Sequence, residues 1–125
     1  MSDYYKLDEN MNPIRCQTWE EFHAWRTSLP QEKRTPIGYR VCKDEQSGIL
    51  VSTVFLGLDH SFDGGVPVLW ETMVFGVRDK DGDDLEIQTR YISHWDAVDG
   101  HREMCEKYLP IETWYVKMLR RIGLG

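Results

Sequence analysis

Four strand-like segments follow one another in the middle of the chain, and the connections between them are short. The segments are residues 37–43, 49–58, 68–77 and 85–92. The turn before the last segment contains Asp81-Gly82, a pair typical of tight hairpins. No connection reaches the length of about a dozen residues that a parallel crossover needs. The sequence therefore predicts an antiparallel meander of about four strands.

The segment 49–58 carries apolar side chains on both of its faces. Val51 and Phe55 lie on one face, while Leu50 and Val54 lie on the other. A strand with two apolar faces is typical of the centre of a sheet that is covered on both sides. We therefore expect this strand to lie inside the sheet.

Three helices are predicted around the strands, over residues 18–29, 94–108 and 111–122. The first begins with the form of a capping box, in which Thr18 is the N-cap and Glu21 stands three residues later. All three segments have apolar residues at helical spacing. Strands in a meander with helices gathered to one side give an α+β fold of two to three helices.

Gly100 lies in the interior of the predicted helix 94–108, where glycine costs about 1 kcal/mol relative to alanine. A close approach of this helix to the sheet explains a glycine there best. His101 follows on the apolar stripe of the same helix. We therefore expect His101 to be a core histidine held by hydrogen bonds; the alternative is that it lines a pocket.

The chain has the size of one domain. Its 125 residues, of which 41% are hydrophobic, suffice for one core but not for two. We expect a single α+β domain over residues 1–125. Residues 1–17 would form an N-terminal arm or hairpin, and residues 111–125 a C-terminal helix.

Charge and cysteine content limit the partners and the compartment. The net charge is −6 and most of the chain has no basic stripe, so duplex nucleic acid is not expected as a partner. The three cysteines are odd in number and far apart, which argues against a disulfide framework and a zinc site. No secretion signal or long apolar run is present, so we expect a cytoplasmic protein without a membrane partner. No metal and no cofactor are expected.

Three segments of the chain together resemble a known family. They are STVFLGLDH (Ser52–His60), LWETMVF (Leu69–Phe75), and a third set formed by Arg90-Tyr91, Ser93, Trp95, Ala97 and Gly100-His101. In these segments the chain is similar to a family of small uncharacterised proteins encoded by bacteriophages and prophages. The resemblance implies a phage-type accessory protein in the cytoplasm of a host cell, and it implies no role for any single residue.

The loop 59–67 is the candidate site, because loops held by a rigid sheet are where function tends to lie. Glu71 and Arg90 would orient a polar group there, and Trp95 and His101 would close the cavity from the helix. The simpler alternative is a plain connector, with Glu71 paired to Arg90 on the neighbouring strand. The candidate ligand-binding residues are His60, Phe62, Glu71, Arg90, Trp95 and His101.

Three functions stay open at this point. The first is a non-enzymatic phage accessory protein that binds a host protein or a small ligand, of which a counter-defence inhibitor is one form. The second is a small metal-dependent or acid–base enzyme that uses His60, Glu71 and His101, although no known metal-binding signature supports it. The third is a structural protein that self-assembles into a homo-oligomer through its C-terminal helix.

Overall fold

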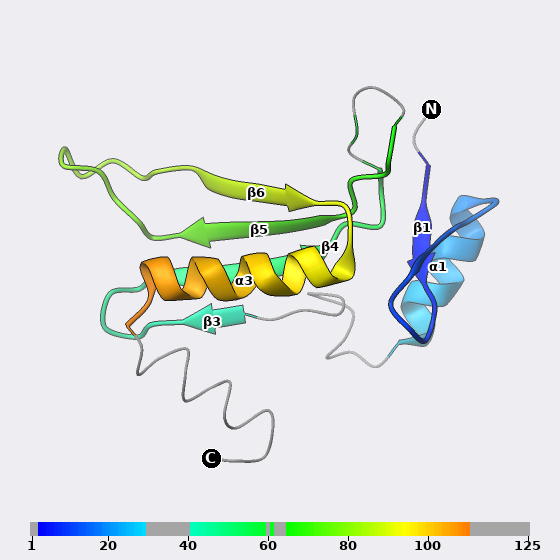
Figure 1. The fold of residues 1–125 in the computed structure, drawn as a ribbon, viewed down its shortest axis with the longest axis horizontal. Helices are drawn as coiled ribbons and strands as arrows, with labels where there is room; N and C mark the ends of the chain where they lie inside the picture. The colour runs from blue at the N-terminus through cyan, green and yellow to red at the C-terminus, as the bar shows by residue number, and fades with distance from the viewer. Residues whose placement is uncertain (1–2, 30–40, 60, 62–64, 111–125) are drawn as a thin grey trace, which may run out of the picture.

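The computed structural model describes residues 3–29, 41–59, 61 and 65–110, and these form two antiparallel sheets and two helices (Figure 1). The order of the larger sheet is β3-β4-β5-β6, so the predicted α+β fold with a four-stranded antiparallel meander is confirmed. The predicted C-terminal helix and the first residues of the segment 37–43 lie outside the described residues. The elements are β1 (Tyr5–Leu7), β2 (Pro13–Arg15), α1 (Trp19–Ser28), β3 (Val41–Lys43), β4 (Leu50–Phe55), β5 (Trp70–Phe75), β6 (Ile87–Tyr91) and α3 (His94–Tyr108).

Strand β4 lies inside the sheet between β3 and β5, as its two apolar faces predict. Its burial is uneven, because Val51, Thr53 and Phe55 are buried whereas Leu50 and Val54 on the other face are partly exposed. Cover of the second face of β4 stays a prediction. Helix α3 packs on the face that carries Val51, Thr53 and Phe55, and the ring of Trp25 in α1 also meets the Phe55 ring edge-on, with 6.0 Å between the ring centroids.

Helix α3 lies in front of the sheet in Figure 1 and packs on β4, β5 and β6. Its N-cap is Ser93, whose hydroxyl accepts a hydrogen bond from the Asp96 N–H at 3.1 Å. The face of the helix that turns to the sheet is buried. It carries Ala97, Gly100, His101 and Cys105.

The helix-covered face of the sheet consists of three rows of side chains that run across β4, β5 and β6. The cross-strand register puts a polar row between two more apolar rows, and the core is accordingly divided into two hydrophobic clusters. One cluster includes Phe55 and Trp70, and the other includes Val51 and Val74. The rows are Val51–Val74–Ile87, Thr53–Thr72–Thr89 and Phe55–Trp70–Tyr91.

The predicted N-terminal hairpin is confirmed as β1–β2, and it lies with α1 at one end of the larger sheet (Figure 1). It continues the pairing beyond the end of β4. Tyr5 N–H donates to the Gly57 carbonyl at 2.8 Å, and Asp59 N–H donates to the Asp3 carbonyl at 3.0 Å. Leu7 of β1 is buried in the cluster of Phe55, so the hairpin is part of the core.

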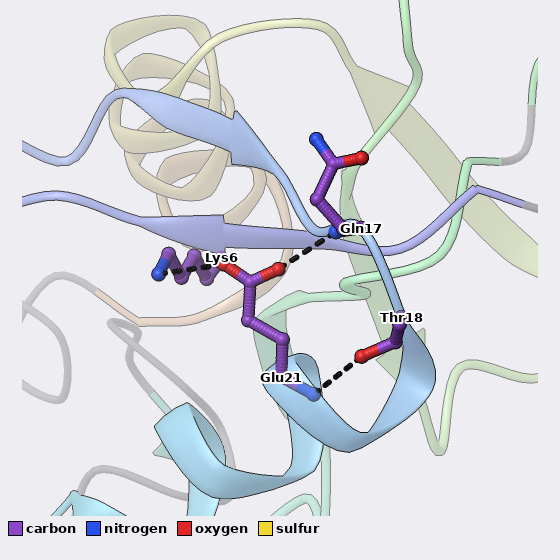
Figure 2. A network of polar contacts seen from close by, with 4 residues as sticks. All are labelled: Lys6, Gln17, Thr18 and Glu21. Carbon is purple, nitrogen blue, oxygen red and sulfur yellow. Dashed lines mark hydrogen bonds and ion pairs between the residues drawn. The ribbon is translucent and has the colours of Figure 1, made fainter.

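The predicted capping box at the start of α1 is confirmed with one change (Figure 2). The Thr18 hydroxyl accepts from Glu21 N–H at 3.1 Å, while Glu21 Oε2 accepts from the N–H of Gln17, one residue before the N-cap, at 2.7 Å. Glu21 Oε1 also pairs with Lys6 Nζ at 3.1 Å, which ties α1 to β1. The Gln17 N–H and then the Lys6 ammonium lower the pKa of Glu21.

Candidate functional site

Glu71 lies on β5, on the face of the sheet that α3 does not cover. It is 8% exposed, and its Oε2 accepts from Arg90 Nε at 3.0 Å and from Gln88 Nε2, both on β6. Glu71 and Arg90 stand directly opposite each other in the register. The pairing of Glu71 with Arg90 across the strands is therefore confirmed. A charge-assisted contact of this kind holds β5 and β6 together on that face.

His101 lies on the opposite face, beneath α3. Its side chain is 3% exposed, and Nδ1 is 2.7 Å from the Thr53 hydroxyl, which is itself 2.6 Å from the Thr72 hydroxyl. All three residues are buried. The expectation of a core histidine held by hydrogen bonds is confirmed. The chain Thr72–Thr53–His101 joins α3 to the two central strands at the polar row.

Glu71 and His101 consequently do not share a site. Successive side chains of a strand point to opposite faces, and Thr72, the neighbour of Glu71, points toward Thr53 and His101. The hypothesis that the candidate residues converge on one pocket is wrong for this pair. His60 and Phe62 lie outside the described residues.

Trp95 lies in the first turn of α3, and 71% of it is exposed. Six residues of helix turn it about 240° from His101, so the two side chains leave the helix in different directions. The expectation that Trp95 and His101 close one cavity is therefore wrong. Ile92 just before the helix is 49% exposed, and the ring of His94 lies edge-on to the indole at 4.9 Å.

Asp59 holds the two ends of the candidate loop together. Its carboxylate accepts from the N–H of Ser61 at 2.8 Å and from the Ser61 hydroxyl at 2.9 Å. It also accepts from Val68 N–H at 3.0 Å, on the far side of the loop. This is the local hydrogen bonding that aspartate gives in turns, and it makes Asp59 a structural residue.

Sequence reasoning missed the polar row, in which Thr53 and Thr72 are buried. Thr53, Thr72 and Thr89 occupy the middle of three successive strands, and this repeated position is the signal that would have found them. Two buried polar atoms beside the row, Tyr91 Oη and Trp70 Nε1, have no hydrogen-bond partner among the described residues. Burial raises the pKa of Tyr91, the nearby Thr72 hydroxyl lowers it by less, and the negative charge of Glu103 raises it.

Two kinds of site have no candidate among the described residues, a metal site and a membrane-spanning helix. No group of three or more His, Cys, Asp or Glu side chains there is placed to hold a metal ion. No helix of the described part is long and apolar enough to cross a membrane.

The chain was compared with protein-family models, with curated proteins and with solved structures, and none of them matches it. The candidate surfaces therefore rest on the geometry of the chain itself. The Glu71–Arg90 ion pair and the hydrogen bond of His101 to Thr53 stabilise the fold itself, whereas Trp95 and Ile92 face outward.

Proposed function

We propose that the chain is a non-enzymatic, phage-type accessory protein that binds a host protein, with Trp95 at the centre of the contact. The observation that carries this proposal is the 71% exposure of the Trp95 side chain, with Ile92 49% exposed three residues earlier. Tryptophan is among the residues most enriched at the energetic centres of protein interfaces. An exposed indole at the end of a packed helix is what we expect at the centre of an interface when the partner is not bound.

The helix presents Trp95 from a rigid base. Ala97, Gly100 and His101 of α3 are buried against the sheet, and the Ser93 cap fixes the first turn. A side chain held in this way loses less conformational freedom on binding than one on a loose loop. The same helix can thus serve the core on one side and a partner on the other.

The exposed charges on the outer side of α3 are more acidic than basic. They are Asp96, Asp99, Glu103 and Glu106 against Arg102 and Lys107, and Arg102 pairs with Asp99 at 3.9 Å. The fitting partner is a protein with an apolar pocket rimmed by lysine or arginine. Opposite charges around such a contact speed association and make it sensitive to salt.

A protein partner fits the exposure of Trp95 better than a small ligand does. Small-molecule sites are concave and enclose most of the ligand surface. Trp95 instead projects from the end of a helix, with less than a third of its surface covered by its own chain. A counter-defence inhibitor that docks on a host protein is one form of this function.

The test is site-specific photocrosslinking in bacterial cells. A photoreactive amino acid replaces Asp99, next to the proposed contact, or Lys80 at the tip of the β5–β6 hairpin; both positions are exposed. A crosslinked host protein from position 99 that is missing from position 80 supports the proposal. The same products from both positions, or none from position 99, would overturn it.

A further inference from the structure

Strand β6 forms an edge of the larger sheet. The strand order ends at β6, and none of the described elements pairs with its outer side, which is the upper edge of the sheet in Figure 1. An edge strand presents backbone N–H and C=O groups that can pair with another strand. This edge therefore offers a surface distinct from the one around Trp95.

Two hydrogen bonds show which residues of this edge point outward. Leu69 N–H donates to the Tyr91 carbonyl at 3.2 Å, and Leu85 N–H donates to the Val77 carbonyl at 2.9 Å. The backbone groups of Tyr91 and Leu85 are thus turned toward the β5 side. The direction of the backbone N–H and C=O groups alternates from residue to residue along an antiparallel strand. The backbone groups of the even-numbered residues between Leu85 and Tyr91 therefore point away from β5. The outward residues are Glu86, Gln88 and Arg90.

We propose that β6 pairs antiparallel with β6 of a second copy of this chain, with Gln88 facing Gln88 across a two-fold axis. Glu86 and Arg90 are exposed and opposite in charge, two residues before and two residues after Gln88, and the contact of Arg90 with Glu71 within the chain is made by its Nε. Antiparallel pairing about Gln88 puts Glu86 of each copy opposite Arg90 of the other. Opposite charges at directly facing positions stabilise a strand pair.

The charges single out this register from its neighbours. Centring the pair on Glu86 or on Arg90 sets like charges against each other, which destabilises it. Centring it on Thr89 leaves Glu86 opposite the apolar Ile92. Centring it on Ile87 moves Glu86 from Arg90 to the uncharged Gln88, and it sets Arg90 opposite Asp84, where Arg78 competes for the same carboxylate at 3.3 Å.

The same register covers exposed apolar surface on the α3 side. Leu85 is 43% exposed, and it comes to lie opposite Tyr91 of the second copy. The two sheets of four strands join into one sheet of eight, with both α3 helices on the same face. The contact is confined to one strand and its neighbours, so the dimer is expected to be weak and to depend on concentration.

Sedimentation velocity of the full chain, over a roughly hundredfold concentration range, tests the pairing through mass action. The parent chain is expected to shift from monomer to dimer as its concentration rises. Gln88→Pro removes an outward N–H, which an edge strand tolerates, and should stay monomeric. Gln88→Ala is the matched control, because it also loses the side-chain bond to Glu71 but keeps the N–H, and it should still dimerise.

The charge pair gives a second test that does not depend on proline. Glu86→Lys sets two positive charges against each other across the axis and should abolish the dimer, while Glu86→Gln should only weaken it. A parent chain that is monomeric at every concentration overturns the proposal. A dimer that survives Gln88→Pro in folded form, or survives Glu86→Lys, overturns it as well.

A cysteine at the axis locates the contact. Facing residues in a hydrogen-bonded antiparallel pair have Cα atoms about 5.5 Å apart, inside the roughly 4.4–6.8 Å range of disulfides. Gln88→Cys should give a covalent dimer on mild oxidation. Lys80→Cys, at the exposed hairpin tip, should not. Equal crosslinking of the two variants, or none from Gln88→Cys, contradicts a two-fold axis at Gln88.

Discussion

The side chain of Tyr91 fills the space that a side chain at Gly100 would need. A Cβ atom built at Gly100 would lie 2.2 Å from Tyr91 Oη and 2.3 Å from Cζ. The helix can approach β6 this closely only because residue 100 has no side chain. The close contact between helix and sheet that the glycine predicts is therefore confirmed.

Replacing Gly100 should destabilise the fold despite the better helix propensity of the new residue. Gly100→Leu gains up to about 1 kcal/mol of propensity but forces Tyr91 out of place, and such overpacking costs about 1–3 kcal/mol. We expect the urea midpoint to fall. An unchanged midpoint would show that the helix has room to move. In a Tyr91→Val background, Gly100→Ala should cost less than in the parent, since the obstructing ring is gone.

Substitutions in the hydrogen-bonded series Thr72–Thr53–His101 under α3 should lower the free energy of unfolding by different amounts. Thr53→Val removes both the bond to His101 and the bond to Thr72, leaving two buried polar groups without this partner. The expected cost is about 1–3 kcal/mol for each group left unsatisfied. Thr72→Val removes only one of the two bonds, so chemical denaturation should show a smaller loss. Equal losses would mean that the contact between Thr53 and His101 contributes nothing.

A side chain at Gly57, where the N-terminal hairpin meets the end of β4, should destabilise the protein. Its φ is +74°, and an added Cβ would lie 2.6 Å from Cε1 of the buried Phe22 ring. Gly57→Ala should therefore lower the thermal midpoint and speed amide exchange in β1. Gly82 is the matched control, because its φ is +85° but nothing lies within 4 Å of its added Cβ. Gly82→Ala should cost only the backbone strain of about 1–2 kcal/mol, and equal effects would refute the contact with Phe22.

Glu21 should make part of the stability depend on pH. Its pKa in the folded protein lies below the ordinary value of 4.5, so its contribution is present above pH 4.5. That contribution is lost as the pH falls through the lowered pKa. The difference in thermal midpoint between the parent and Glu21→Gln should shrink from pH 7 to pH 3. Glu20→Gln, an exposed neighbour, serves as control, and a difference for Glu21→Gln that is independent of pH would contradict the capping geometry.

The order of the elements was predictable because the connections are short and their turn residues are specific. Hairpin-length turns leave only antiparallel neighbours, which placed β4 inside the sheet and β5 beside β6. The pairing of Glu71 with Arg90 followed from the same register. Thr18 and Glu21 likewise marked the start of α1 by their spacing alone.

The site was not predictable, because both faces of the central strands carry apolar residues. On β5, Val74 faces α3 while Met73 and Phe75 face away, so hydrophobicity does not tell which face the helix covers. Without that choice, Glu71 and His101 could be assigned to one pocket although they lie on opposite faces. Trp95 was misplaced for a related reason, since an aromatic residue in a helix is more often part of a core than an exposed contact.

The most direct measurement of the proposed function is a calorimetric titration of the purified partner, once crosslinking has identified it, with the parent chain and two variants. Trp95→Ala should weaken binding at least about tenfold, or about 1.4 kcal/mol, as expected for a residue at the centre of an interface. Trp19→Ala is the matched control, because this indole is also exposed, at 50%, but stacks on His23 of α1. Its affinity should equal that of the parent. Equal affinities of the Trp95→Ala variant and the parent would contradict the account.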